Sequence, residues 1–238
     1  MPEEDDPTLE LRGAVIKQLV VSAVMLAVMA AIFYASAGRT DIPRSWLLFG
    51  ATLVHFTGST LVVARLNPGL ISQRLTVRRV GSKSWDEVLM RVCNLTMLLL
   101  LPAVAGLDVG RYGWSALGAQ YAALGLALMA VSSVLISWSM AVNPYFEPTV
   151  RIQGDRGHRV VSTGPYGLVR HPGYLSGILW AVSVPLVVGS FYAFVPVLLY
   201  SVLMVLRTQL EDRTLQGELK GYAEYARRVR YRLLPGFW

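Results

Sequence analysis

Long apolar runs alternate with short polar segments along the chain, in a pattern typical of membrane-spanning helices. A helix needs about 20 apolar residues to cross the ~30 Å hydrocarbon core of a bilayer, and several runs approach or exceed that length. The pattern predicts about six transmembrane helices, at Ala14–Ala37, Trp46–Ala64, Val88–Leu107, Trp114–Val142, Tyr174–Val188 and Phe191–Leu206. We therefore expect an all-α integral membrane protein.

The last two predicted helices form a tight hairpin. Pro185 and Gly189-Ser190 interrupt the apolar run, and proline and glycine are the strongest breaks in a helical pattern. The first arm of this hairpin is short for a span, so we expect it to tilt or to reach only partway across. Residues 1–140 would then hold four spans, and residues 141–238 a central loop, the hairpin and a C-terminal helix.

Charge predicts how these helices are oriented. The segments 1–17, 65–91, 141–172 and 207–238 carry 19 of the 22 Lys and Arg residues. Because basic loops face the cytoplasm, we expect both termini there, in a bacterial-type plasma membrane. The first ten residues lack the basic start of a signal peptide, so the first helix is expected to be a span. The net charge of +7 then needs no nucleic-acid partner.

Histidine and cysteine are too few and too scattered for a metal cluster. Cys93 is the one cysteine and lies in an apolar run, where a small buried side chain is expected. His55, His158 and His171 show no grouping with it, so we expect no metal site. His55 lies within a predicted span. We interpret it as a neutral imidazole bonded to a neighbouring helix, with a functional role as the alternative.

Two loops carry weaker signals. Residues 66–87 mix basic and apolar side chains and are expected to lie along the membrane interface as an amphipathic piece. After the fourth predicted span, Val150–Gln153 is expected to be extended, and residues 154–157 to form a turn. No GxGxxG motif or βαβ pattern surrounds that turn, which argues against a Rossmann-type nucleotide site.

The segment at residues 158–174, HRVVSTGPYGLVRHPGY, is dense in polar groups and lies between two apolar runs. Pro172 lacks an N–H and disfavours the α conformation in the residue before it. We therefore expect Arg170 and His171 on an extended corner, with a helix that begins near Pro172. A helix N-terminus flanked by Arg and His favours binding of an anionic group.

A second polar segment follows the hairpin. Arg207 and Glu211 are four residues apart and share a helix face, where the helix leaves a span and charge is costly. In the C-terminal sequence GYAEYARRVRYR, Tyr222 and Tyr225 are three residues apart and could close over a cofactor. Ordinary aromatic packing is the alternative for either tyrosine.

These motifs together resemble the isoprenylcysteine carboxyl methyltransferase and phospholipid methyltransferase superfamily. The likeness rests on HxVV, GPYxxVRHPxY, the apolar hairpin and RxxxED at residues 207–212, and it covers roughly residues 140–235. It implies an integral-membrane methyltransferase with a cytoplasmic pocket for S-adenosylmethionine. The acceptor would be amphipathic or lipid-like, such as an isoprenylcysteine carboxylate. Asp212 stands where the family usually has a second Glu.

The resemblance and the chemistry of this cofactor assign the site residues. Its carboxylate needs an Arg or a helix N-terminus, its ammonium needs a carboxylate, and its adenine needs an apolar or aromatic slot. Catalytic roles are expected for Arg170, His171, Arg207 and Glu211. Cofactor contacts are expected from His158, Val161, Gly164, Tyr166, His171, Pro172, Tyr174, Glu211, Asp212, Tyr222 and Tyr225. We expect the two polar segments to meet in one pocket.

Two other functions stay open. Membrane reductases related to sterol reductases share a similar C-terminal architecture and use NADPH. A non-catalytic membrane protein, such as a scaffold or transporter subunit, is the third possibility. The cofactor that binds distinguishes all three: S-adenosylmethionine, NADPH or neither.

Overall fold

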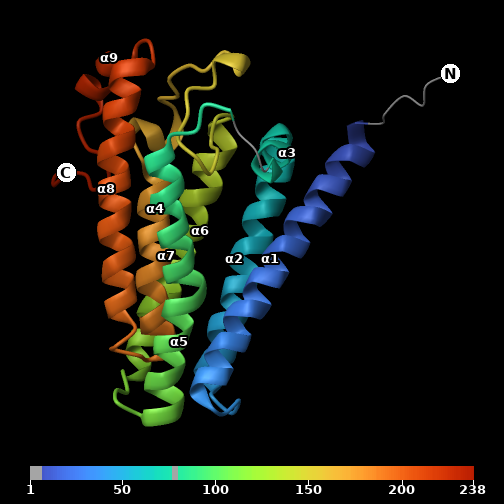
Figure 1. The fold of residues 1–238 in the computed structure, drawn as a ribbon, viewed down its shortest axis with the longest axis vertical. Coiled ribbons are helices and arrows are strands. Elements are labelled where there is room, and N and C mark those ends of the chain that lie inside the picture. Colours follow the sequence, from blue (N-terminus) through green and yellow to red (C-terminus); the bar gives the residue numbers. More distant parts are fainter. Residues whose placement is uncertain (1–6, 77–79) are drawn as a thin grey trace.

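The computed structural model describes residues 7–76 and 80–238 as a bundle of helices (Figure 1), with no strand among them. The expectations for the polar residues before Pro7, and for residues 77–79 of the interfacial loop, lie outside this range. The helices are α1 Pro7–Ala37, α2 Pro43–Leu66, α3 Pro68–Leu75, α4 Ser84–Leu95, α5 Leu101–Gly106, α6 Ala119–Val142, α7 Pro172–Val188, α8 Phe194–Glu218 and α9 Tyr222–Arg228. The short helix α3 lies within the loop that we expected to be amphipathic.

Helices α4 and α5 belong to one continuous helical stretch, Ser84–Tyr112. Its turns at Thr96–Leu100 and Leu107–Tyr112 are π-helical. Gly113 ends the stretch in the left-handed conformation, at φ 60°, which glycine adopts without steric cost. The predicted third span was therefore too short. The predicted fourth span began too early, because helix α6 starts at Ala119.

Among the residues that the structure describes, five helical stretches are long and apolar enough to cross a membrane, and α7 is a shorter apolar helix of 17 residues. The prediction of an all-α integral membrane fold is confirmed, whereas the number of spans and their orientation remain predictions. Helix α8 continues to Glu218, beyond the predicted end of the span at Leu206 and through the segment that was expected to be helical there. Arg207 and Glu211 therefore lie on the same rigid helix as the apolar second arm of the hairpin.

Small residues let helix α7 approach its neighbours closely. A Cβ atom on Gly173 would lie 2.4 Å from the Phe146 ring, and one on Gly177 would lie 2.7 Å from the Tyr200 hydroxyl oxygen. On the side facing α6, a Cβ atom on Gly125 would lie 2.9 Å from the Ser183 carbonyl oxygen. At Gly125 one close neighbour is backbone, as is common where membrane helices pack, whereas at Gly173 and Gly177 it is an aromatic side chain. This close packing holds the start of α7 in a fixed position.

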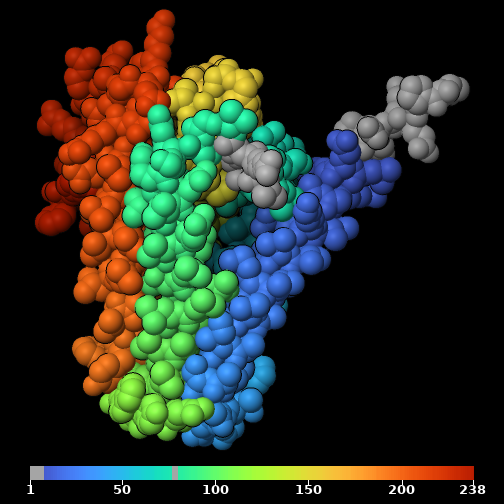
Figure 2. Space-filling model, viewed as in Figure 1, coloured from blue at the N-terminus to red at the C-terminus, as the bar shows by residue number. Residues whose placement is uncertain are grey.

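The bundle opens toward one end. Helices α1, α2 and α3 lean away from the others at the end where α9 and the loop between α6 and α7 lie (Figure 1). In the space-filling view, the surface is hollowed between α1 and the α4–α5 stretch, with α2 at the base of the hollow (Figure 2). The two polar segments of the sequence gather at this open end.

Candidate active site

A cavity of about 300 Å³ lies at the open end of the bundle, between the α6–α7 loop, α8 and α9. This volume is at the lower end of the range for pockets that bind small molecules. The first polar segment lines the cavity with Arg170, His171 and Tyr174, and the second lines it with Arg207 and Glu211. The structure therefore brings together the two segments that the hairpin separates in the sequence.

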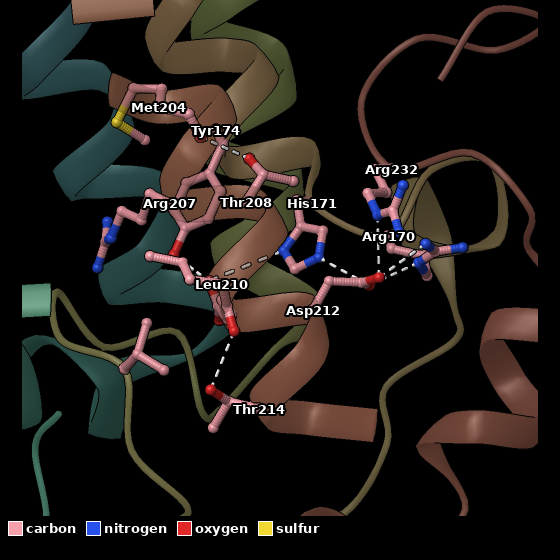
Figure 3. Close-up of polar contacts among 12 residues, drawn as sticks. Arg170, His171, Tyr174, Met204, Arg207, Thr208, Leu210, Asp212, Thr214 and Arg232 are labelled. Carbon is pink, nitrogen blue, oxygen red and sulfur yellow. Dashed lines mark hydrogen bonds and ion pairs between the residues drawn. The ribbon is translucent and has the colours of Figure 1, made fainter. Parts of the chain in front are cut away.

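Asp212 lies beside the cavity and is completely buried. Its carboxylate accepts two hydrogen bonds from Arg170, at 2.7 and 2.9 Å, and one from Arg232 at 3.0 Å (Figure 3). The Tyr222 hydroxyl at 3.0 Å and the Gln216 amide at 2.9 Å also donate to it. The carboxylate thus joins α8, α9, the α6–α7 loop and the C-terminal tail. Its oxygens are fully bonded within the protein and it does not line the cavity, contrary to its expected contact with a cofactor.

The guanidinium of Arg170 is also hydrogen-bonded within the protein. Besides the two bonds to Asp212, its Nη1 donates to the carbonyl oxygens of Val229 and Arg230, at 2.8 and 2.9 Å. Its backbone N–H donates to the Tyr231 carbonyl oxygen at 3.0 Å. Every guanidinium nitrogen has a protein partner, so this charge is not available to a ligand carboxylate. Arg170 positions the corner before α7 instead.

His171 connects the buried carboxylate to the cavity. Its Nε2 lies 3.3 Å from the Asp212 Oδ1, and its Nδ1 lies 3.8 Å from the Glu211 Oε2. The imidazole ring is nearly parallel to the Tyr174 ring, at an interplanar angle of 7° and a centroid distance of 5.6 Å. Since an ionised carboxylate only accepts hydrogen bonds, Asp212 fixes a hydrogen on Nε2 and turns Nδ1 toward Glu211.

Glu211 has no arginine partner in the described part of the chain, although its side chain is only 20% exposed. The Tyr174 hydroxyl donates a hydrogen bond to its Oε2. The other carboxylate that lines the cavity, Glu147, is paired with Arg151 at 2.8 Å and with Arg156 at 3.6 Å. Glu211 is therefore the cavity carboxylate with negative charge left to offer a cationic ligand.

Arg207 pairs with a residue that sequence reasoning missed. Its Nε and Nη2 donate to the Asp86 carboxylate at 2.6 and 3.2 Å, and Nη2 also donates to the Pro148 carbonyl oxygen at 2.8 Å. The guanidinium lies over the Tyr174 ring, 4.8 Å from its centroid. Arg207 therefore forms its ion pair with Asp86 and not with Glu211, although both Arg207 and Glu211 line the cavity and contact Tyr174. The feature of the sequence that could have identified Asp86 is that it is an acidic residue in the first turn of a helix beside a span.

The two C-terminal tyrosines are bonded inward. The Tyr222 hydroxyl donates to Asp212, and burial together with that negative charge raises the pKa of Tyr222 well above its usual range. The Tyr225 hydroxyl donates to the Tyr166 carbonyl oxygen at 2.7 Å. Both side chains line the cavity, but their hydroxyl groups hold α9 against the site. Only the aromatic rings of Tyr222 and Tyr225 are therefore available to contact a ligand.

The other predicted residues fall into two groups. His158, Val161 and Tyr166 line the cavity, whereas Gly164 and Pro172 do not. Gly164 has φ 59°, and a Cβ atom there would lie 2.8 Å from the Trp138 indole nitrogen, so its role is to shape the loop. Pro172 begins helix α7, as predicted. His158 accepts a hydrogen bond from the Gln153 N–H, and burial and the nearby Arg151 charge lower its pKa.

Arg159 is a cavity residue that the assignment of roles passed over. It lines the cavity and is exposed, and the described residues provide no ion pair for it. Arg151, Arg170 and Arg207 also line the cavity, but each is paired with a carboxylate. Arg74 lines it too, and its guanidinium donates to the Phe146 carbonyl oxygen at 3.1 Å and lies over the Phe146 ring. The position of Arg159 in the HRVV motif was visible in the sequence. What the sequence could not show is that the neighbouring arginines would be neutralised.

Comparison with known proteins points to one family. Residues 123–217 match the model of the isoprenylcysteine carboxyl methyltransferase (ICMT) family. A probable protein-S-isoprenylcysteine O-methyltransferase of Oryza sativa subsp. indica is 27% identical over 146 residues, which cover 59% of this chain and 68% of the plant protein. A Delta(14)-sterol reductase of Mus musculus is 33% identical over 82 residues. That match covers 33% of this chain and only 20% of the reductase.

A solved structure shares the fold. The eukaryotic intramembrane Ras methyltransferase ICMT aligns with 89% of this chain and 77% of its own, with a TM-score of 0.52 and 15% identity. At that identity the likeness concerns the fold alone. The family match falls on α6, α7, α8 and the loop between α6 and α7, which supply both polar segments of the site. The resemblance of this chain to the isoprenylcysteine carboxyl methyltransferase family is thereby confirmed.

Proposed function

We propose that this protein is an integral-membrane methyltransferase that transfers the methyl group of S-adenosylmethionine to an amphipathic or lipid-like acceptor. An isoprenylcysteine-type carboxylate or a related small lipophile is the acceptor class that the plant relative suggests. One structural observation carries the proposal. Glu211, which has no arginine partner among residues 7–76 and 80–238, and Arg159, which has no ion pair among them, line the same cavity.

The cavity residues fit the charges of this cofactor. Its ammonium would bind the Glu211 carboxylate, and its carboxylate would bind the Arg159 guanidinium. The rings of Tyr145, Phe146 and Tyr225 give the cavity aromatic surface for the adenine. When bound, the cofactor supplies an electrophilic methyl carbon. The acceptor's lone pair forms a bond to that carbon while the carbon–sulfur bond breaks, and the bonding electron pair stays on sulfur.

The protein contributes position and a dry environment. Arg170 and Asp212 fix the corner that carries His171, and the pair of Arg207 and Asp86 fixes α8 against α4. Holding two reactants in line and away from water supplies most of the acceleration for a displacement of this kind. A carboxylate acceptor needs no base. A thiol or amine acceptor would lose its proton to a neighbouring group, and His171 and Glu211 lie in the cavity for that role.

The route of each reactant follows from where the cavity lies. It is at the end of the bundle with the basic segments, so we expect the cofactor to enter from the cytoplasm and the acceptor from the bilayer. In this account both termini face the cytoplasm of a bacterial-type plasma membrane. Reporter fusions after Trp238 and within residues 38–42 would test it, and an external C-terminus would contradict it.

Labelled methyl transfer tests the activity directly. Purified protein in detergent is incubated with S-adenosylmethionine carrying a radioactive methyl group and with a total lipid extract. We expect label in the organic phase, and we expect Glu211→Gln to reduce it strongly at cofactor concentrations near the parent's Kd, without unfolding the protein. The proposal would be contradicted if the protein binds the cofactor but all label stays in the aqueous phase. This result would have to hold both with the lipid extract and with an added prenylcysteine analogue.

A reductase is the second candidate, because a Delta(14)-sterol reductase is 33% identical to this chain over 82 residues. Such an enzyme would bind NADPH, and Arg159 would then face its 2′-phosphate. The two functions differ in the sign of charge that Glu211 must bind. A methyltransferase places a cation beside Glu211, whereas the phosphates of NADPH would be repelled by it. The cavity charges therefore favour S-adenosylmethionine.

A further inference from the structure

A second cavity, of about 260 Å³, lies between α1, α2, α3 and α6. It shares Arg74 and Ile136 with the candidate active site, so the two cavities adjoin. Apolar side chains such as Met25 and Met140 line it, but so do His55 and Ser59 on a membrane helix. Figure 2 shows the surface hollowed beside α1, with α2 at its base. Polar groups at such a depth are costly and require an explanation.

Two hydrogen bonds between α2 and α6 account for part of this polarity. The His55 Nδ1 lies 2.6 Å from the Ser133 Oγ, and the Ser137 Oγ donates to the Ser59 Oγ at 3.0 Å. The residues of each helix are four positions apart, so the two bonds form a ladder along the interface. Such bonds commonly join membrane helices. Neither of these two bonds involves Nε2, the second ring nitrogen of His55.

The bonds of Ser133 determine which ring nitrogen carries the hydrogen. The Ser133 hydroxyl donates its single hydrogen to the Met129 carbonyl oxygen at 2.8 Å. Its oxygen must then accept from His55, so Nδ1 carries the hydrogen and Nε2 of the neutral imidazole keeps a lone pair. Within residues 7–76 and 80–238, no hydrogen bond reaches Nε2, and this atom keeps some exposure in a residue that is only 9% exposed. A hydrogen-bond acceptor is thus held at the surface of the second cavity.

The neighbourhood of His55 contains a second unsatisfied group. The Trp180 ring stacks on the imidazole, with centroids 6.3 Å apart, and the Trp180 indole nitrogen is buried without a partner among the described residues. Buried polar groups are nearly always hydrogen-bonded. The Trp180 nitrogen does not line the second cavity, whereas His55 does. The free acceptor on His55 is therefore the group in the described structure that indicates a place for a polar donor of a ligand.

We propose that the second cavity holds the body of the acceptor, and that His55 Nε2 accepts a hydrogen bond from a hydroxyl or N–H group within that body. This inference rests on the proposed methyltransferase function. Within the proposed acceptor class, it favours lipophiles with a polar donor inside their apolar part over those with unsubstituted prenyl or acyl chains. Ser133 and Asn143, which lines the active site, are ten residues apart on α6, about 15 Å. The donor should lie about that far from the reacting group.

Matched fatty acids test this proposal without any methyl transfer. 12-Hydroxystearate carries a hydroxyl group about twelve carbons from its carboxylate, a separation comparable with those ~15 Å, and stearate lacks it. Binding of each to detergent-solubilised protein is measured by microscale thermophoresis, in the absence of cofactor. We expect 12-hydroxystearate to bind about fivefold more tightly, equivalent to about 1 kcal/mol. The corresponding 12-methoxystearate, which cannot donate, should bind no better than stearate.

Two substitutions separate the role of Nε2 from the fold. His55→Asn places an N–H near the position of Nδ1, so it keeps the bond to Ser133 but removes the acceptor at Nε2. We expect it to bind both fatty acids with the affinity that the parent has for stearate. His55→Gln places an oxygen near the position of Nε2 and should keep the preference. Equal binding of both fatty acids by the parent, or an undiminished preference in His55→Asn, would overturn the proposal. Cofactor binding, measured separately, tests the methyltransferase function itself.

Discussion

The carboxylates of Glu211 and Asp212 are neighbours in sequence but lie in opposite environments. Asp212 is completely buried and is held by Arg170 and Arg232. Glu211 is one helical step earlier, lines the cavity and has no arginine partner in the described residues. A helix rotates by about 100° between adjacent residues, so one turn of α8 presents one carboxylate to the protein and the other to the ligand. We therefore assign the first to structure and the second to the cofactor.

Asp212→Asn should destabilise the fold. The change leaves Arg170 and Arg232 without their common counter-charge, and breaking a buried ion pair typically costs about 3–5 kcal/mol. We expect a clear fall in the thermal unfolding midpoint in detergent. Glu218→Gln is the matched control on the same helix, because its pair with Lys83 is largely exposed and should contribute no more than about 1 kcal/mol. Equal midpoints for the two variants would contradict this role for Asp212.

The contributions of Arg207 and Asp86 to the free energy of unfolding should be strongly coupled. Asp86→Asn and Arg207→Gln are each expected to lower the free energy of unfolding by several kcal/mol. The double variant should cost less than the sum by about 1–3 kcal/mol, since the two side chains share their bonds. The exposed pair of Arg39 and Asp41 provides a control cycle with a coupling near zero. Additive effects at Asp86 and Arg207 would show that their contact contributes nothing to stability.

Arg159→Gln should weaken cofactor binding and leave the fold intact. Arg159 is exposed and has no ion pair within the described structure, so its loss removes one screened contact to the cofactor carboxylate. We expect a loss of about fivefold to tenfold in affinity for S-adenosylmethionine, close to 1–1.4 kcal/mol. Arg228→Gln, an exposed change on α9 outside the cavity, serves as the control. Equal affinities in both variants would remove Arg159 from the site.

His158 should make stability depend on pH. Burial and the Arg151 charge hold its pKa below the ordinary value of 6.5. As the pH falls below 6.5, the unfolded chain therefore takes up a proton that the folded protein resists, and stability is lost. His158→Gln should reduce the fall in unfolding midpoint between about pH 7.5 and pH 5.5. A fall of the same size in the parent and in the variant would show that His158 does not cause it.

The sequence predicted the hairpin and the corner before α7 well. Pro172, Pro185 and Gly189 act through the backbone, so their effects can be inferred from the sequence alone. Helix ends at Ala119 and Glu218 could not be located in the same way. Leu206 is the last residue of an apolar run, and the spacing of Arg207 and Glu211 predicted a helix beyond it, but no local pattern marks the end at Glu218.

It was harder to predict which charged residues of the site form ion pairs than to predict which residues lie in the site. Arg207 and Glu211 satisfied the spacing of a helical ion pair, yet Arg207 binds Asp86, which is 121 residues away. Asp212 was recognised as a site residue, but its burial depends on Arg232 in the tail, which no local pattern connects to it. Contacts over such separations depend on how the helices pack. They decide which charges are neutralised and which, as at Glu211 and Arg159, remain for a ligand.

Calorimetric titration of the purified protein with S-adenosylmethionine tests the central claim most directly. The account predicts saturable binding to the parent, no measurable binding of NADPH, and a loss of about tenfold to hundredfold in affinity in Glu211→Gln, the range expected for a hydrogen bond to a charged group. The Glu211→Gln variant should unfold near the temperature of the parent. Unchanged affinity in that variant, or binding of NADPH in place of S-adenosylmethionine, would contradict the account.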